Sequence, residues 1–316
     1  MHEYEYVSEE MLCVLAQIVG EDNVLMTEPM RAHTTFKIGG PADVLVTPTS
    51  VEALVRVLDL CFQANVPPTV VGNGSDLLVG DRGVRGIVVL LRENLSHIKV
   101  DAGAWRVVAE AGALLRDVAL AAADEGLSGM EPLWGIPATV GGACFMNAGA
   151  YDGTTGDVLE TVDVYVPSKH GNRGSVVTFE ARDLNLGYRK SRVHDDGLIV
   201  LRATFKLAPS TPAMVRSAMD DYQARREEKQ PLDMPSAGST FKRPEGHFAG
   251  KLIMDAGLRG ARVGGAQVSE KHCGFVVNAG GATAKDVLGL IEQVQDEVKQ
   301  QFGVDLEPEV RMLGEF

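Results

Sequence analysis

The chain has 316 residues, of which 45% are hydrophobic and 23% charged, which is ordinary usage for a globular protein and excludes a disordered or fibrous chain. Its formal net charge of −13 argues against broad contact with nucleic acid or an anionic membrane, because both need clustered lysine and arginine. No apolar run approaches the roughly 20 residues of a membrane-spanning helix, and the acidic start MHEYEYVSEE is unlike a signal peptide. We therefore expect a cytoplasmic protein of two or three domains.

The first two-thirds of the chain predict an α+β fold with many short strands. An amphipathic helix near the N-terminus precedes TTFKIGGPADVLVTP, which predicts a strand, a glycine turn and a second strand. Thr49 can cap the next helix and Glu52 can close a capping box, and apolar residues recur at helical spacing until Asn65 and Pro67. PPTVVGNGSDLLVGDRGVRGIVVLL then predicts a short strand, a glycine-rich loop and another strand.

A third unit repeats this order. WRVVAEAGA predicts a strand and a turn, Leu114 to Ala123 a helix, and Gly126 the end of that helix. The runs LETVDVYVP, SVVTFEA and LIVLRATFKLAP predict three further strands. We place a domain boundary near residue 208, so that residues 1–207 form one domain of two subdomains that divide near residue 97.

Residues 208–304 predict a smaller α/β domain. Thr211 and Pro212 are typical of a helix start and open the charged run AMVRSAMDDYQARREEKQ. A short strand, a helix from Phe248 to Ala256, the strands AQVS and GFVVN and a long helix from Thr283 to Gly303 follow.

The last segment, residues 305–316, predicts a strand, DLEPEVRML. Alternation of side chains would place Glu309 on one face with Glu307 and Arg311, opposite residues 306, 308 and 310. We interpret Glu307 as a solvated carboxylate.

The cysteines and histidines predict no metal or redox site. The seven histidines form no HxH or HExxH cluster. The four cysteines lie among apolar neighbours without CxxC spacing, which indicates reduced core residues: Cys13, Cys61, Cys144 and Cys273.

Two glycine-rich loops are the strongest indication of a ligand. VGNGSDLLVG resembles the dinucleotide fingerprint GxGxxG, but Leu77 stands at the third glycine and a strand, not a helix, follows, which disfavours a Rossmann site. Such a loop can still direct several backbone N–H groups at an anion such as a pyrophosphate. The second loop, GIPATVGGACFMNAGAYDG, allows close approach to a flat or phosphorylated ligand. One such loop alone would be interpreted as a tight turn, whereas two in one domain favour a cofactor bound mainly by backbone.

Several motifs in sequence order, taken together, resemble one known family. They run from Thr34 to Gly314: TTFKIGGPA, GNGSDLLV, the long run from AGALLRDV to FMNAGAY, YRKS, GSTFKRP, LIMDAGLRG, GGAQVSEKHCGFVVN and LEPEVRMLG. The chain thereby resembles the UDP-N-acetylenolpyruvoylglucosamine reductase family, flavoenzymes of peptidoglycan precursor synthesis. This resemblance implies an FAD-binding domain of the vanillyl-alcohol-oxidase type, followed by a smaller α/β substrate-binding domain and a C-terminal strand that carries a catalytic glutamate. The short interval between YRKS and GSTFKRP is similar to the subtype that lacks an extra substrate loop.

The resemblance implies a reaction in two halves. NADPH reduces non-covalently bound FAD, and the hydride then passes to C3 of UDP-N-acetylglucosamine enolpyruvate while an acid protonates C2, giving UDP-N-acetylmuramate. The implied proton donor is Ser239 of GSTFKRP, a residue that turn chemistry alone could otherwise explain. Arg189 and Glu309 are implied beside the enolpyruvyl carboxylate.

Binding residues follow from the same motifs. Implied around the UDP-sugar are Tyr188, Arg243, His272 and Arg311, although His272 could equally be a surface histidine and Tyr188 could pack beside the flavin. Implied cofactor-binding residues are Gly72, Asn73, Gly74, Ser75, Asp76, Leu77, Gly135, Ile136, Pro137, Thr139, Gly141, Gly142, Asn147, Ala148 and Gly149.

The sequence departs from the family pattern at three places. Asp76 stands where asparagine is usual, Ala138 where glycine is usual, and AYDGTTGD replaces AYGGE. An ionised aspartate cannot donate a hydrogen bond, so we expect somewhat weaker FAD binding, while Ala138 requires a negative φ.

Two alternative functions remain open from the sequence. One is a flavin oxidase of the same fold, although neither glycine loop carries a histidine for covalent tethering. The other is a catalytically silent flavin- or nucleotide-sugar-binding protein, against which stands the joint presence of Arg189, Ser239 and Glu309. Nothing in the chain indicates a stable protein partner.

Overall fold

The structure is a computed structural model that describes residues 7–92, 94–168 and 172–316. It divides into two compact units. Unit one runs up to Met26 and continues through Val44–Asn73 and Gly86–Arg225. Unit two comprises Thr27–Asp43, Gly74–Arg85 and Arg226–Phe316. Two short segments from the first hundred residues thus belong with the C-terminal part of the chain, and the division of the chain near residue 208 stays a prediction.

Residues 9–90 contribute two packed helices and a four-stranded sheet. The helices α1 (Glu9–Val19) and α2 (Val51–Gln63) contact each other and turn their apolar faces to the core. The sheet order is β1-β2-β5-β3, with β3 parallel to β5. Its strands are β1 (Val24–Pro29), β2 (Pro41–Val46), β3 (Thr69–Val71) and β5 (Val84–Leu90).

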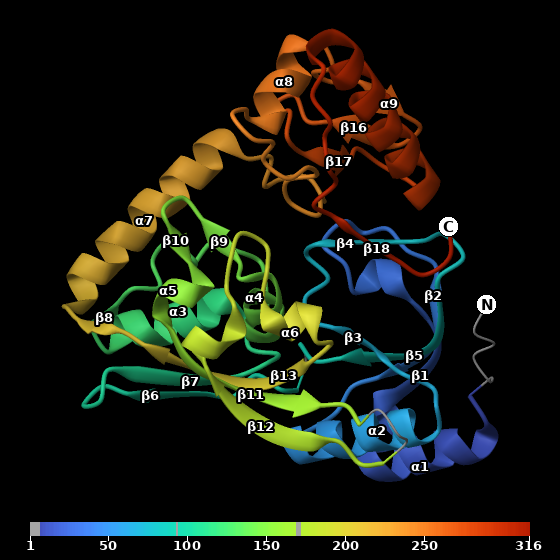
Figure 1. Cartoon of the computed structure of the whole chain (residues 1–316), viewed down its shortest axis with the longest axis vertical. Helices are drawn as coiled ribbons and strands as arrows, with labels where there is room; N and C mark the ends of the chain where they lie inside the picture. The colour runs from blue at the N-terminus through green and yellow to red at the C-terminus, as the bar shows by residue number, and fades with distance from the viewer. Residues whose placement is uncertain (1–6, 93, 169–171) are drawn as a thin grey trace. The chain divides into compact units, whose positions relative to one another are not determined.

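A five-stranded antiparallel sheet forms the larger part of unit one. Its order is β12-β11-β13-β7-β6, and helix α4 lies against β13 and β7 (Figure 1). The strands are β6 (Ile98–Asp101), β7 (Arg106–Glu110), β11 (Leu159–Val166), β12 (Ser175–Glu180) and β13 (Ile199–Lys206). Around it lie α3 (Leu115–Asp124), β8 (Leu127–Ser128), α4 (Val140–Met146), β9 (Gly149–Ala150), β10 (Gly153–Thr154), α5 (Thr155–Val158), α6 (Arg192–Asp195), β14 (Ala208–Pro209) and α7 (Pro212–Lys229).

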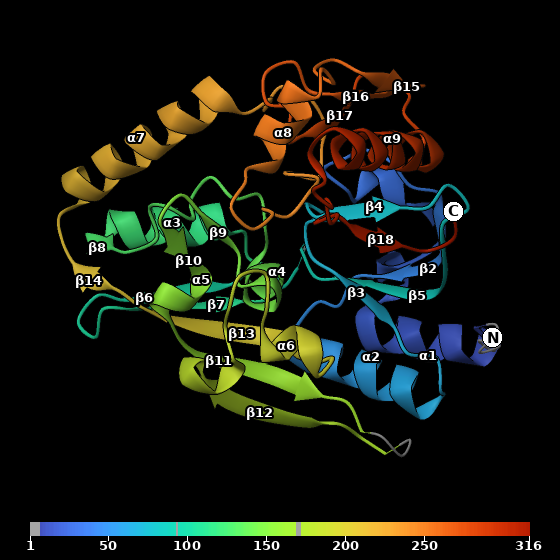
Figure 2. The ribbon, with the colours of Figure 1, turned by 45° about the horizontal axis from the view of Figure 1, so that its top comes forward.

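Unit two is built on the long helix α9 (Ala284–Phe302). Thr283 and Asp286 form its capping box, and Gly303 ends it in the left-handed conformation, φ 70°. Helix α9 packs on α8 (Ala249–Asp255) and on the sheet β15-β16-β17, as Figure 2 shows. The remaining strands are β15 (Arg262–Val263), β16 (Ala266–Val268), β17 (Val276–Asn278) and the parallel pair β4 (Leu77–Val79) and β18 (Arg311–Leu313).

Most predicted elements are confirmed, and four details are corrected. Ser50, not Thr49, caps α2, because its hydroxyl accepts a hydrogen bond from the Ala53 N–H at 3.1 Å. The run TTFKI forms turns instead of a strand, since Lys37 has a left-handed φ of 57° that breaks extended pairing. The short strand expected between α7 and α8 is an irregular loop. The final strand begins only at Arg311, and Glu309 lies in the extended segment before it.

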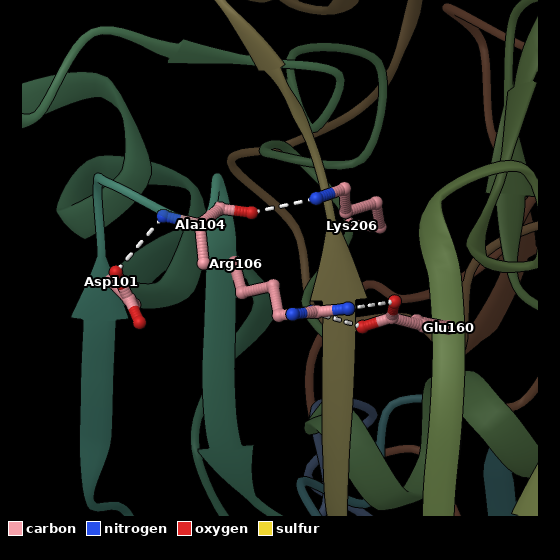
Figure 3. A network of polar contacts seen from close by, with 5 residues as sticks. All are labelled: Asp101, Ala104, Arg106, Glu160 and Lys206. Atoms are coloured by element: carbon pink, nitrogen blue, oxygen red, sulfur yellow. Dashed lines mark hydrogen bonds and ion pairs between the residues drawn. The ribbon is translucent and has the colours of Figure 1, made fainter.

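A polar network at the end of the five-stranded sheet ties its strands together (Figure 3). Arg106 of β7 makes a bidentate contact with Glu160 of β11, both distances being 2.5 Å. The hydrogen bond and charge of Arg106 hold the pKa of the Glu160 carboxyl below its usual range. Lys206 of β13 donates to the Ala104 carbonyl at 2.6 Å. The network joins β7, β13 and β11 at the surface.

No helix in the described part of the chain is both long and apolar enough to cross a membrane.

Candidate functional site: two glycine loops and the Ser239 loop

The two glycine-rich loops meet within unit one. The Asn73 side-chain amide donates to the Pro137 carbonyl at 2.6 Å. A Cβ placed on Gly72 would stand 2.2 Å from Thr139 Oγ1, so only glycine permits this approach. Thr139 in turn caps α4 by accepting from the Gly142 N–H at 3.4 Å. Residues far apart in the chain thus form one cradle of backbone and small side chains.

The cradle fits a flat cofactor with an anionic linker. Its lining is mostly glycine backbone, which can come close to a ligand. The Gly141 N–H beside it donates to the Ala111 carbonyl at 2.8 Å and is already committed within the protein. Trp134, directly before Gly135, has a buried indole N–H for which the described residues supply no acceptor. A buried donor of this kind is costly unless a ligand accepts from it.

Ala138, where the family usually has glycine, is compatible with this backbone. It is absent from the described non-glycine residues of positive φ, and its carbonyl accepts from the Leu115 N–H at 2.9 Å. Ala138 therefore meets the requirement for a negative φ that the sequence set.

The YRKS motif forms a tight turn in unit one. The N–H groups of Gly187 and Lys190 donate to each other's carbonyls at 3.0 and 3.2 Å. Arg189 at its tip has a left-handed φ of 53°, uncommon for a side chain of this size. Tyr188 is 61% exposed, and the Arg189 guanidinium lies 5.1 Å from the centre of its ring. The turn therefore exposes the Tyr188 ring, with the half-buried Arg189 guanidinium against it.

Ser239 lies in a loop of unit two that hydrogen bonds anchor on both sides. Toward β17, the Thr240 N–H donates to the Gly274 carbonyl at 2.8 Å, and Thr240 Oγ1 accepts from the Val276 N–H at 2.8 Å. Toward the C-terminal segment, the Thr240 carbonyl accepts from the Glu309 N–H at 2.8 Å. Ser239 is half-buried and follows Gly238, whose φ is 79°.

An antiparallel pairing joins the Ser239 loop to the C-terminal segment that carries Glu309. Phe241 faces Pro308, and the Lys242 N–H donates to the Glu307 carbonyl at 2.9 Å. This register places Glu309 opposite Thr240, the residue directly after Ser239. Leu306 and Val310 are buried and Glu307 is exposed, as the alternation predicted, but Pro308 and Glu309 are both half-buried.

The C-terminal segment also carries Arg311 beside the first glycine loop. The Arg311 N–H donates to the Asp76 carbonyl at 2.9 Å, and Arg311 is paired with Leu77 in the parallel strands β18 and β4. Residues 74–77 of the loop therefore share one backbone network with Glu309 and the Ser239 loop in unit two.

The remaining two predicted substrate residues also lie in unit two. The Arg243 guanidinium stacks on Phe248, 4.0 Å from the ring centre, and lines a shallow depression. His272 is partly buried, which lowers its pKa, and its Nδ1 accepts from the Gly274 N–H at 3.2 Å. At neutral pH His272 therefore offers a hydrogen bond and no positive charge. His272 belongs to the turn whose Gly274 carbonyl accepts from the Thr240 N–H, and its side chain is only partly exposed.

Thr35 is a residue that sequence reasoning did not single out. Its hydroxyl donates to the Ser236 carbonyl at 2.7 Å, and its N–H donates to the Gly74 carbonyl at 3.2 Å. Thr35 thereby ties the cofactor loop to the Ser239 loop. The sequence feature that could have identified Thr35 is the threonine pair before Phe36, since threonine hydroxyls often form hydrogen bonds to loop backbone.

The unusual Asp152 of AYDGTTGD has a specific contact in unit one. Its carboxylate accepts from the Tyr222 hydroxyl of α7 at 3.0 Å, and the rings of Tyr151 and Tyr222 lie 5.1 Å apart. Burial and this hydrogen bond raise the pKa of Tyr222, so its hydroxyl stays protonated as the donor. The departure from the family pattern thus fastens α7 to the β9–β10 hairpin.

Fold and loops together define a flavin-binding protein of the vanillyl-alcohol-oxidase type with a distinct C-terminal domain. Residues 42–168 match the FAD binding domain family, and residues 230–313 match the family described as UDP-N-acetylenolpyruvoylglucosamine reductase, C-terminal domain.

Similar proteins extend this match over nearly the whole chain. A Clostridium botulinum protein named UDP-N-acetylenolpyruvoylglucosamine reductase is 51% identical over 94% of this chain and 95% of its own length. One of the same name from Agathobacter rectalis is 52% identical over 93% of this chain and 95% of its own. The crystal structure of the Thermus caldophilus reductase aligns with a TM-score of 0.76 at 36% identity, covering 92% of this chain and 98% of that one. The chain belongs to the UDP-N-acetylenolpyruvoylglucosamine reductase family.

Gly72→Ala should abolish tight FAD binding. The new Cβ would overlap Thr139 Oγ1, which would displace the cap of α4 and separate the two loops. We expect the flavin content of the purified protein, measured from visible absorbance per mole of chain, to fall at least about 10-fold. Gly103→Ala is the matched control, because its Cβ would meet nothing closer than Asp101 Oδ1 at 3.6 Å. Full flavin content in Gly72→Ala would contradict the assignment of the cradle as the FAD-binding site.

Asp76→Asn should bind FAD more tightly than the natural chain. One carboxylate oxygen of Asp76 is shielded from solvent, and the charge lies in a loop expected to face a pyrophosphate. An amide removes the repulsion and adds a donor, so we expect the dissociation constant to fall by about 10-fold, roughly 1.4 kcal/mol. Titration of the apoprotein with FAD measures this, and an unchanged constant would show that the Asp76 charge does not act on the cofactor.

Proposed function

We propose that this protein reduces UDP-N-acetylglucosamine enolpyruvate to UDP-N-acetylmuramate, with FAD as its cofactor and NADPH as the reductant. The observation that supports it most is the pairing of the Ser239 loop with Glu309, next to residues 74–77 of the cofactor loop. Relatives about half identical to this chain carry the name of this reductase. A cytoplasmic location stays a prediction from the sequence.

The residues of the cradle would hold FAD. Gly72, Asn73 and the stretch from Gly135 to Pro137 offer backbone for the anionic linker, and the Trp134 indole N–H offers a buried donor. When bound, FAD supplies hydride transfer from NADPH to C3 of the enolpyruvyl ether.

Arg189 stabilises the charge that develops on the substrate. Addition of hydride at C3 pushes negative charge into the carboxylate, which becomes enolate-like. A fixed guanidinium contacts both oxygens of that group and stabilises the transition state more than the ground state. The left-handed backbone of Arg189 and the exposed face of the turn suit such a contact.

Ser239 delivers the proton. Its Oγ–H bond breaks as the C2–H bond of the lactyl product forms, and solvent returns a proton to the oxygen, since Ser239 is only half-buried. A hydroxyl is a weak acid, but a carbon with carbanion character is very basic, so position outweighs acidity. Glu309, in the segment paired with the Ser239 loop, orients the reacting group.

Four further residues would bind the nucleotide-sugar. Arg243 and Arg311 supply positive charge for the diphosphate in an otherwise acidic protein, with Tyr188 as an aromatic surface and His272 as a neutral hydrogen-bonding group.

A stopped-flow experiment tests this function. The flavin of the purified protein is reduced with NADPH without oxygen and then mixed with the enolpyruvyl UDP-sugar. Rapid return of the oxidised flavin bands, absent without the sugar, is the expected result. Reoxidation only by oxygen would indicate an oxidase, and failure of NADPH to bleach the flavin would indicate a silent binding protein.

A further inference from the structure

The YRKS turn is fastened at both ends to helix α4, whose other end belongs to the cofactor cradle. We propose that Ser191 and Asn147 are positioning residues that hold Arg189 in place relative to the cofactor cradle. This inference rests on the proposed function, because it concerns how Arg189 meets the substrate carboxylate. All the contacts that carry it lie within unit one.

Ser191 is completely buried and uses its hydroxyl twice. The Oγ donates to the Phe145 carbonyl in the last turn of α4 at 2.6 Å, and it accepts from the His194 N–H at 3.2 Å as the cap of α6. A cap alone needs only the second contact. The first joins the end of the turn, two residues after Arg189, to the helix.

Asn147 fastens the other end. This residue ends α4 with a left-handed φ of 44° and is 6% exposed. Its Nδ2 donates to the Gly187 carbonyl at 3.0 Å, and its Oδ1 accepts from the Gly156 N–H at 2.8 Å. The Asn147 side chain is therefore committed to contacts within the protein.

The two anchors bracket Arg189. Gly187 lies two residues before it and Ser191 two residues after it, while Arg189 itself holds a left-handed backbone that L-residues disfavour. Such a conformation persists only where its surroundings impose it. Because Thr139 begins α4 in the cradle and Asn147 ends it at the turn, one short helix sets the distance between the two.

Ser191→Ala tests the proposal. We expect flavin content and the rate of flavin reduction by NADPH to stay within about twofold of the natural chain. Reoxidation by the enolpyruvyl sugar should slow by about 10- to 100-fold, since small misplacements of a positioned group cost about that much. The affinity of the oxidised protein for the sugar, measured by calorimetry, should weaken as well.

A double-mutant cycle with Arg189→Ala separates positioning from general structure. If Ser191 acts through Arg189, adding Ser191→Ala to Arg189→Ala should slow reoxidation by less than about twofold further. Ser50→Ala is the control, because it removes a helix cap of the same kind from α2 and should leave both half-reactions unchanged. Additive losses, equal slowing of both half-reactions, or a Ser191→Ala protein identical to the natural chain would overturn the proposal.

Asn147→Asp provides a second route should Ser191→Ala fail to fold. The carboxylate keeps the acceptor for Gly156 but replaces the donor to the Gly187 carbonyl with a repulsive oxygen. Reoxidation by the sugar should slow, and an unchanged rate of reoxidation would overturn the role of Asn147. Failure of the proposed function is distinguishable, because the natural chain itself would then not be reoxidised by the sugar.

Discussion

Ser239→Ala should leave reduction of the flavin by NADPH within about threefold of the natural rate while turnover falls by about 10²- to 10⁴-fold, the range for loss of a general acid. The reason is that protonation of C2 belongs only to the second half-reaction. The Thr240 contacts that hold the loop are made by its backbone and its own hydroxyl, so the substitution does not remove them. Single-turnover absorbance traces of each half-reaction measure the effect separately.

Ser236→Ala is the matched control for this variant. Ser236 lies three positions earlier in the same half-buried loop, and its hydroxyl accepts only from the nearby Gly238 N–H at 3.4 Å in the described structure. It should turn over at nearly the natural rate. If Ser239→Ala slowed both half-reactions equally, or if Ser236→Ala matched its loss, the proton-donor role of Ser239 would be wrong.

Arg189→Lys should reduce turnover by about 10- to 100-fold, although the charge is retained. A lysine ammonium is a point charge and cannot make two parallel hydrogen bonds to a carboxylate, and loss of a hydrogen bond to a charged group costs about 1.5–3 kcal/mol. Lysine also stacks less well on the exposed Tyr188 ring. Steady-state rates against the enolpyruvyl sugar check this, with flavin reduction by NADPH as the internal reference.

Arg192→Lys is the control for the arginine substitution. Arg192 lies three residues further on and pairs with Asp196 at 2.7 Å across one helical turn, a contact that lysine can retain. Its turnover should be close to natural. Near-natural turnover of Arg189→Lys would count against the carboxylate contact and would also remove the basis for Ser191 and Asn147 as positioning residues.

Local patterns predicted the regular elements well because apolar side chains recur with one period in helices and another in strands. Helix α2 is an example, where apolar spacing gave the element correctly but the cap was assigned one residue early, to Thr49 instead of Ser50. The run TTFKI has the composition of a strand, yet Lys37 adopts a left-handed backbone there. Its polar groups bond to Gly74, Ser236 and Asn278, all distant in the chain, and no local pattern contains that information.

The sequence by itself determined the class of ligand and the family, because glycine-rich loops, YRKS, GSTFKRP and LEPEVRMLG are local motifs whose order carries the resemblance. Only the tertiary structure decided which motifs share a backbone network. It joined Asn73 to Pro137, the Ser239 loop to Glu309, and the two ends of the Arg189 turn to α4. The physical reason is that these contacts are hydrogen bonds of irregular backbone between distant segments. Their partners are chosen by the packing of the whole chain and not by the period of any one segment.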